Sequence, residues 1–281
     1  MHYIGFDIGG SSVKAALVRD KQIIKSQAAG LPGNLEGLFN LLDQMFGNLS
    51  AGVEIGGVGF GFPGTMDLAR EVMFKSSNIS YLDNQPLKKL LAEKFKPYPI
   101  KLEHDAHCFL LAEKETGLAK DLKNVFYLTL GSGVGGAWMV DGKIAAGEHG
   151  AAGEVAHTII DISDSLELEE LAANKFIKKE LGMDSLQAYQ LAQSGDKWAR
   201  DVFEKLGLNL GVGIANIINI FDPGAVILSG GVGEASDLIL PNIKERIDKL
   251  VTSPAAKETK ILFSRLGQFG GALGAALLCE S

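Results

Sequence analysis

Three clusters of glycine, each directly after a short apolar segment, constrain this 281-residue chain more than any other feature. The segments and their clusters are residues 3–8 with Gly9-Gly10, residues 125–130 with the run Gly131 to Gly136, and residues 225–228 with Gly230-Gly231. Because glycine has no Cβ, its backbone N–H groups can approach an anion closely and can adopt positive φ. One cluster alone is equally compatible with an ordinary tight turn. Three of them at the ends of predicted strands favour turns that bind phosphate.

The residues around these glycines exclude one common phosphate-binding motif and argue against another. No cluster matches the Walker pattern G-x-x-x-x-G-K-[ST]. Gly131, Gly133 and Gly136 have the dinucleotide-binding spacing G-x-G-x-x-G, but the residues after them predict a strand, whereas that motif opens a helix.

The order of strand, glycine turn and strand occurs twice along the chain. Alternating residues predict strands at 3–8, 12–19 and 22–27, and again at 125–130 and 137–140. The other predicted strands are 56–62, 100–103, 225–228 and 260–263, and the predicted helices are 35–49, 85–95, 106–116, 167–181, 186–193, 197–220 and 270–278. Two such halves predict an α/β protein of two domains with a ligand cleft between them.

Charge, cysteine content and hydropathy exclude several classes of protein. The 27 basic and 34 acidic residues give a net charge of -7, which argues against a general nucleic-acid binder. Only Cys108 and Cys279 occur, so a disulfide scaffold or a multi-cysteine metal site is excluded. No secretion signal opens the chain, and its longest apolar run, 206–221, contains three asparagines and is shorter than a membrane span. We expect a cytoplasmic protein without membrane contact.

Asp7 immediately precedes the first glycine pair. A carboxylate in this position could hold Mg²⁺ next to phosphates bound by the turn, with Ser11 or Ser12 and Lys14 nearby. The alternative is an aspartate that stabilises the turn by bonding its own backbone.

Four ordered motifs resemble those of the ROK family, which comprises bacterial sugar kinases and related repressors. The motifs are Asp7-Ile8-Gly9-Gly10-Ser11-Ser12-Val13-Lys14, Glu103-His104-Asp105-Ala106, Leu128 to Gly136, and Gly150-Ala151-Ala152-Gly153-Glu154-Val155-Ala156-His157. The resemblance runs from Tyr3 to the last helix. It implies a two-domain actin-like/ribonuclease H-like ATPase fold, with one domain of residues 1–104 plus 266–281 and the other of 105–265, and it also implies a homodimer.

The resemblance further implies transfer of the γ-phosphoryl group of ATP, with Mg²⁺, to a hexose or N-acetylhexosamine, usually at the 6-hydroxyl. Asp105 would be the general base, and Asp7 would hold Mg²⁺ through the nucleotide. The implied sugar-binding residues are Asn78, His104, Asp105, Glu154, His157 and Glu169. The implied nucleotide-binding residues are Asp7, Gly9, Gly10, Ser12, Lys14, Gly131, Ser132, Gly133, Gly135, Gly230 and Gly231, the last two beside the adenosine. For Glu169, a solvated helix face shared with Glu167 and Glu170 is an equal alternative.

Two departures from the family pattern stand out. Residues 158–164, after His157, contain none of the cysteines that bind structural zinc in most members, so we expect no structural zinc. His104 occupies a position where the family usually has a sugar-contacting asparagine, and the larger imidazole could change the sugar preference. A replacement metal site using His104, His107, His149 and His157 with Glu154 is an alternative that matches no common ligand spacing.

Three other functions were weighed against an ATP-dependent kinase. Family repressors carry a helix-turn-helix ahead of this body, and Asp7 lies too near the start of the chain for one. A non-catalytic sugar sensor need not keep Asp105. A polyphosphate-dependent glucokinase is the third alternative, because such enzymes lack the cysteines too; the cluster Lys88, Lys89, Lys94, Lys96 and Lys101 could serve as its phosphate track, or could simply be a solvated face.

Overall fold

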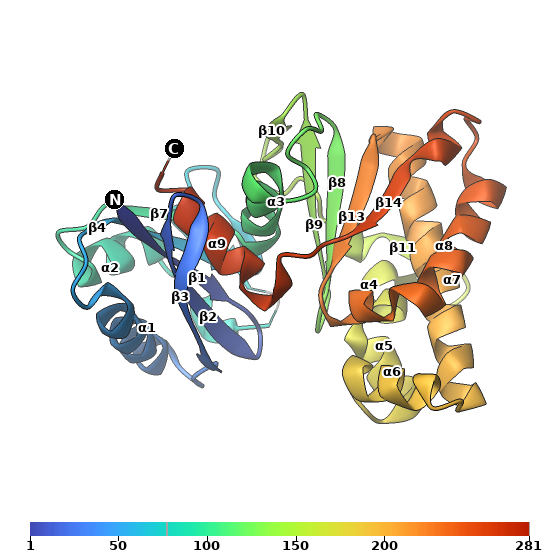
Figure 1. The fold of residues 1–281 in the computed structure, drawn as a ribbon, viewed down its shortest axis with the longest axis horizontal. Helices are drawn as coiled ribbons and strands as arrows, with labels where there is room; N and C mark the ends of the chain where they lie inside the picture. The colour runs from blue at the N-terminus through green and yellow to red at the C-terminus, as the bar shows by residue number, and fades with distance from the viewer. Residues whose placement is uncertain (77, 281) are drawn as a thin grey trace. The chain divides into compact units, whose positions relative to one another are not determined.

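The protein is described here by a computed structural model covering residues 1–76 and 78–280 (Figure 1). It forms two compact units: unit 1 is Met1–Lys120, Ile144–Ala152 and Leu266–Ser281, and unit 2 is Asp121–Lys143 and Gly153–Arg265. The expected boundary at residue 104 differs from this division, because the helix that begins at Asp105 belongs to unit 1.

Unit 1 is built on a five-stranded sheet in the order β3-β2-β1-β4-β7. Strand β1 is antiparallel to β2 and parallel to β4, which is parallel to β7. The elements are β1 (His2–Ile8), β2 (Ser12–Arg19), β3 (Gln22–Gly30), α1 (Leu35–Ser50), β4 (Ile55–Phe62), β5 (Thr65–Met66), β6 (Met73–Lys75), η1 (Ser80–Leu82), α2 (Leu87–Lys94), β7 (Ile100–His104), α3 (Asp105–Thr116), η5 (Gly267–Phe269) and α9 (Gly270–Leu277).

The alternation of side chains along β1 assigns its residues to the two faces of this sheet. Phe6 and Ile8 are fully buried in a core shared with α1 and α2. Gly5 and Asp7 point to the other face, where a Cβ at Gly5 would overlap the backbone of Ala272 in α9. Asp7 therefore lies on the α9 side of the sheet.

Close packing of α9 accounts for several glycines outside the turns. A Cβ at Gly59 in β4 would overlap the carbonyl oxygen of Ala275, and one at Gly274 would overlap that of Cys108 in α3. The backbones of α9, the sheet and α3 touch directly at these points. This contact explains why the last helix, far away in sequence, completes unit 1.

Unit 2 is built on a sheet of matching order, β10-β9-β8-β13-β14, with β8 antiparallel to β9 and parallel to β13. The elements are β8 (Val125–Leu130), β9 (Val134–Val140), β10 (Lys143–Ile144), η2 (Val155–His157), β11 (Ile159–Asp161), β12 (Leu166–Glu167), α4 (Leu168–Ala172), α5 (Asn174–Leu181), α6 (Ser185–Gln193), α7 (Lys197–Phe221), β13 (Ala225–Ser229), η3 (Gly231–Ala235), α8 (Ser236–Leu250), η4 (Ala256–Glu258) and β14 (Lys260–Phe263). The predicted α/β class and the repeated architecture are confirmed.

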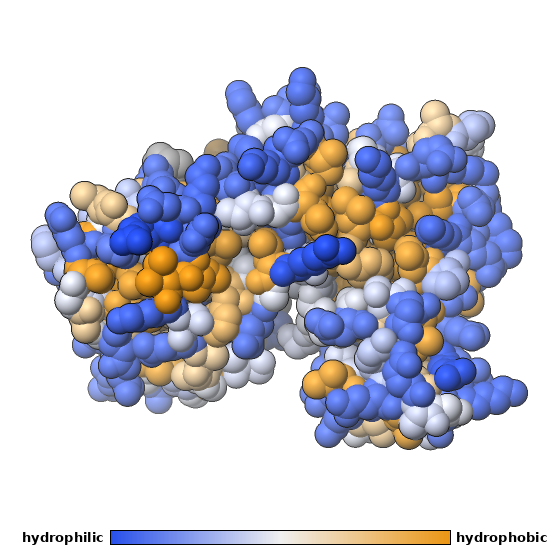
Figure 2. Space-filling view, in the orientation of Figure 1, coloured by the Kyte–Doolittle hydropathy of each residue, from blue (hydrophilic) through white to orange (hydrophobic). Residues whose placement is uncertain are grey.

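Helices α7 and α8 cover the core of unit 2 with amphipathic faces. Leu206, Leu210 and Ile214 of α7 are fully buried together with Ile239 and Ile243 of α8. Figure 2 shows mostly hydrophilic residues on the outward side of α8. In the described part of the chain, none of the helices combines the length and the apolar character that crossing a membrane requires.

Two predicted elements differ from the structure, and one long helix was not predicted. The helix predicted at 167–181 is two helices, α4 and α5, because Ala173 is extended with ψ 176°. The turn predicted at 131–136 ends at residue 133, since Val134 and Gly135 already pair with Leu130 and Thr129. Helix α8 was not predicted, and Pro241 inside it is the residue that argues against a helix.

Candidate active site

Asp7 is a buried carboxylate on β1 beside the first glycine turn. Its side chain is 6% exposed, and Lys14 Nζ, opposite it on β2, lies 3.9 Å from Asp7 Oδ2. A Cβ at Gly271 would come within 2.8 Å of Asp7 Oδ2, so the start of α9 closes this side of the carboxylate. Burial raises the pKa of Asp7 to about 7; the negative charge of Asp105 adds to this rise, while Lys14 opposes it.

The first glycine turn joins β1 to β2 and contacts Asn78. Gly9 N donates to Ser12 O (2.9 Å) across the turn. A Cβ at Gly10 would lie 2.8 Å from the Cβ of Asn78, an exposed residue. Asn78 is therefore next to the turn, although it lies 68 positions after Gly10 in the sequence.

Asp105 is the first residue of α3, directly after β7. Its Oδ1 accepts from the N–H of Ala106 (2.7 Å) and lies 3.3 Å from His104 Nδ1. Burial raises the pKa of Asp105 to about 6, against the opposing effects of the Ala106 N–H, His107 and Lys14. The helix N-cap position is held by His104, so Asp105 is not the N-cap residue. A carboxylate with a pKa near neutrality suits a general base.

A hydrogen-bonded network supports the junction between β7 and α3. Glu103 Oε1 accepts from Arg70 Nε (2.7 Å) and from the N–H of His104 (2.8 Å), and lies 3.2 Å from Nδ1 of the buried His107. Burial favours neutral Glu103, but the hydrogen bond and charge of His107 and the charge of Arg70 outweigh it, so the pKa of Glu103 is lowered. Arg70 Nη1 also donates to Gly150 O (3.3 Å).

Sequence reasoning missed Arg70, because a single arginine in a loop carries no motif. The contact of this side chain with Glu103 links the loop that holds it to β7. Glu103 belongs to the motif Glu103-His104-Asp105-Ala106, but the residue pattern implies no role for it.

The second glycine turn, between β8 and β9, is packed against Glu169. Gly131 N donates to Gly133 O (2.9 Å), and Val134 N donates to Glu169 Oε2 (3.0 Å). A Cβ at Gly133 would overlap the Glu169 carboxylate, whose Oε1 pairs with Lys175 (2.7 Å). Ser132 is exposed at the tip, whereas Gly135 lies in β9 rather than in the turn.

The third glycine cluster lies at the same edge of the sheet as the second. Strands β8 and β13 are parallel, with Ser229 paired to Thr129, so both end at this edge. Gly230 has φ 89° and a Cβ there would overlap the backbone of Leu130. Only glycine satisfies both conditions. Gly231 follows at the start of η3.

Glu154 and His157 lie at the two ends of η2 in unit 2. His157 Nδ1 is 2.8 Å from Glu167 Oε2, and its Nε2 is 4.0 Å from Glu154 Oε2. The hydrogen bond with Glu167 raises the pKa of His157; partial burial opposes this rise, and the charges of Glu154 and Glu169 add to it.

The residues present do not fit a structural zinc ion at His157. Zinc prefers cysteine and histidine ligands, and both cysteines, Cys108 and Cys279, belong to unit 1. Across residues 1–76 and 78–280, no group of three or more His, Cys, Asp or Glu side chains could hold a metal ion.

We expect the fold to be independent of tightly bound transition metal. Dialysis against EDTA followed by removal of the chelator should leave the thermal unfolding midpoint unchanged, because no folding energy comes from metal ligation. Differential scanning calorimetry checks this. A drop of more than about 5 °C after chelation would contradict it, since that corresponds to the loss of a substantial stabilising interaction.

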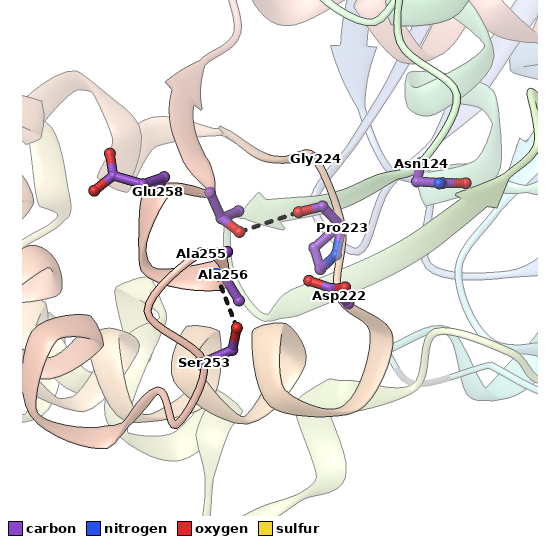
Figure 3. A pocket seen from close by; sticks show the side chains of 9 residues that line it. Asn124, Asp222, Pro223, Gly224, Ser253, Ala255, Ala256 and Glu258 are labelled. Atoms are coloured by element: carbon purple, nitrogen blue, oxygen red, sulfur yellow. Dashed lines mark hydrogen bonds between the residues drawn. The ribbon is translucent and has the colours of Figure 1, made fainter.

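A cavity of about 360 Å³ in unit 2 lies away from the glycine turns (Figure 3). Its lining includes Asn124 and Gly224, which immediately precede β8 and β13, so it lies at the opposite end of the strands from Gly131 and Gly230. Its polar groups are partly bonded to one another, as in the hydrogen bond from Thr259 Oγ1 to Pro223 O (3.1 Å).

Comparisons with known proteins agree with this arrangement. The model of one protein family, described as the ROK family, matches residues 3–281. A glucokinase of Halalkalibacterium halodurans is 25% identical over 99% of this chain and 94% of its own, and an N-acetyl-D-glucosamine kinase of Aliivibrio salmonicida is 30% identical over 98% and 99%. The crystal structure of a ROK family glucokinase from Streptomyces griseus in complex with glucose and AMPPNP aligns over 99% of both chains with a TM-score of 0.89 and 25% identity.

Proposed function

The chain belongs to the ROK family and has its actin-like ATPase fold, and from this premise we propose that it is a kinase transferring the γ-phosphoryl group of ATP to a hexose or an N-acetylhexosamine, at the 6-hydroxyl. The relatives named as glucokinase and N-acetyl-D-glucosamine kinase support this sugar class, and the AMPPNP complex of a relative supports ATP as the donor.

One observation carries the proposal most directly, the environment of Asp105. Burial raises the pKa of its carboxylate to about 6, and the hydrogen bond to Ala106 together with the Glu103 network holds it at the start of α3. A base in this state is ionised at neutral pH and can accept the proton of an attacking hydroxyl. Near-neutral basicity and a fixed position are the two properties that the proposed reaction demands.

Asp7 fits a magnesium ion that arrives with the nucleotide. Its carboxylate oxygens are the hard ligands Mg²⁺ prefers, and its raised pKa shows that Lys14 alone does not offset the cost of burying its charge. A Mg²⁺ ion would neutralise charge on the phosphate oxygens. The turn Gly9-Gly10, together with Ser12 and Lys14, would bind phosphate in unit 1; the turn Gly131 to Gly133 would do so in unit 2, with Gly230 and Gly231 beside the adenosine.

Sugar recognition is proposed for polar side chains of both units. Asn78 and His104 accompany Asp105 in unit 1, and Glu154 and His157 serve in unit 2. Glu169 contributes indirectly, because its carboxylate holds Val134 N and packs on Gly133. These contacts favour a role for Glu169 in supporting the phosphate-binding turn Gly131 to Gly133.

We expect kcat/KM to fall as the pH decreases from about 7 to below 6. The general base is active only when deprotonated, so the activity that depends on Asp105 should be lost as the pH decreases through its raised pKa, about 6, and protonation of Asp7, whose pKa is raised to about 7, should begin the fall at higher pH. A pH–rate profile from pH 4.5 to 8.5 checks this. Activity that stays constant down to pH 4.5 would contradict the assignment of the base.

The function itself is tested by following ADP release with a panel of hexoses and N-acetylhexosamines, with polyphosphate run in parallel as donor. Turnover with ATP and at least one sugar supports the proposal. Turnover with polyphosphate alone favours the polyphosphate-dependent alternative; two lysines of the cluster that could serve as its phosphate track, Lys88 and Lys94, pair with Glu71 and Asp43. Sugar binding without turnover favours a sensor.

A further inference from the structure

The ring of His157 lies between two carboxylates, only one of which is within hydrogen-bonding distance. Nδ1 is 2.8 Å from Glu167 Oε2, whereas Nε2 is 4.0 Å from Glu154 Oε2. The side chain is 53% exposed. A hydrogen bond requires roughly 3.2 Å or less, so the Nε2 side of the ring is open to a ligand.

A short antiparallel pair of strands brings Glu167 to this ring. Residues 158–164 lack the cysteines that the family pattern leads one to expect, and the chain instead forms β11, returns through β12 and pairs Ile159 with Glu167. The carboxylate at the end of β12 therefore reaches Nδ1 without any metal ion. The segment after His157 supplies an acid in place of metal ligands.

Hydrogen bonds and packing hold the backbone around Glu167 in place. Glu167 is the N-cap of α4 in a capping box, in which its N–H donates to Glu170 Oε2 (2.9 Å) and its carboxylate accepts from the N–H of Glu170. The next residue, Leu168, donates its N–H to Thr158 O (2.9 Å) and is fully buried, with its Cδ1 2.6 Å from where a Cβ at Gly213 of α7 would lie. The backbone that carries the Glu167 carboxylate is therefore held firmly.

The number of protons on the imidazole ring determines which of its nitrogens can donate a hydrogen bond. Neutral imidazole carries one N–H, and a carboxylate at Nδ1 draws that proton to Nδ1, leaving Nε2 as an acceptor. Only the protonated ring donates at both nitrogens. The hydrogen bond with Glu167 and the negative charges of Glu167, Glu154 and Glu169 each favour the protonated ring, and partial burial opposes them.

We propose that Glu167 is a positioning residue for sugar binding, which orients His157 and keeps it protonated so that Nε2–H donates to a sugar hydroxyl. This inference rests on the proposed function, because the ligand of His157 is the sugar. It also links sugar affinity to pH, with affinity lost as the pH rises through the pKa of His157.

The test is Glu167→Gln in the full chain, which keeps the size and the hydrogen-bond acceptor but removes the charge. The titration of the His157 ring, followed by NMR without substrate and assigned with His157→Gln, should move to lower pH. The sugar KM at pH 7.5 should rise about tenfold, as expected when a charge-assisted hydrogen bond is weakened, with kcat changed less than about twofold. The rise in KM of the wild-type chain with pH should also begin at lower pH in the variant.

Glu170→Gln is the matched control, because Glu170 belongs to the same capping box and does not contact His157. It should leave both the titration and the KM unchanged. The proposal is overturned by an unchanged His157 titration in Glu167→Gln, by an unchanged sugar KM, or by equal effects in Glu170→Gln, which would point to the helix cap. Absence of kinase activity in the wild-type chain would instead overturn the proposed function, since the titration is read without substrate.

Discussion

Replacing Asp105 by asparagine should lower kcat by a factor of about 100 to 10,000, the range typical for the loss of a general base. The amide cannot take the proton of the sugar hydroxyl, yet its Oδ1 can still accept from the N–H of Ala106, so the start of α3 should be preserved. Steady-state kinetics with the best sugar of the panel measures the loss. Sugar binding, measured by calorimetry, should change little.

Asp43→Asn is the appropriate control for this variant. Asp43 is also an aspartate of unit 1, but its side chain is 63% exposed and lies 3.5 Å from Lys94 on the surface. Its replacement should leave kcat unchanged. Phosphorylation at nearly the wild-type rate by Asp105→Asn would remove the basis for the kinase mechanism proposed here.

The second large effect is expected for stability, from Gly274→Ala in α9. A methyl group at this position would overlap the carbonyl oxygen of Cys108, and neither helix backbone can yield without disturbing the contacts of α9 with β1 and β4. We expect a loss of about 3 kcal/mol in the free energy of unfolding, the upper end of what overpacking costs. Denaturant unfolding followed by circular dichroism measures it.

Gly47→Ala provides the matched comparison. Gly47 is also inside a helix, α1, but no atom lies within 4 Å of where its Cβ would be. Here alanine should stabilise the protein by about 0.5–1 kcal/mol, because it restricts the unfolded chain more than glycine does. Equal stabilisation by both substitutions would show that α9 does not touch α3 as closely as described.

Much of the fold could be predicted because the spacing of apolar residues along the sequence indicates strands and helices directly. The strands that carry Asp7 and the glycine turns, and the long helix α7, alternate or repeat clearly enough to be located within a few residues. The break at Ala173 could not be predicted, because it lies in the φ/ψ angles of one ordinary residue. Helix α8 was not predicted; it contains Pro241, a residue unfavourable in a helix interior.

Some residues of the candidate site could also be predicted from the sequence, and others could not. Asp105, the glycine turns and the pair Glu154 and His157 were found through motifs, which record residue type and spacing. No roles were predicted for Arg70 and Glu167, because their contacts with Glu103 and His157 depend on the tertiary structure. For Glu169 the sequence predicted either sugar binding or a solvated helix face; in the structure its carboxylate contacts Val134 N and Lys175.

The residue pattern by itself determined the α/β class, the repeated arrangement of strand, glycine turn and strand, the family resemblance and the lack of cysteines for zinc. These follow from local spacing and from counting. Only the tertiary structure decided which carboxylate reaches His157, which glycines serve the close packing of α9 rather than a turn, and that Asp7 and Asp105 have raised pKa values. Burial and through-space contacts decide these properties, and they depend on residues that are distant in the chain.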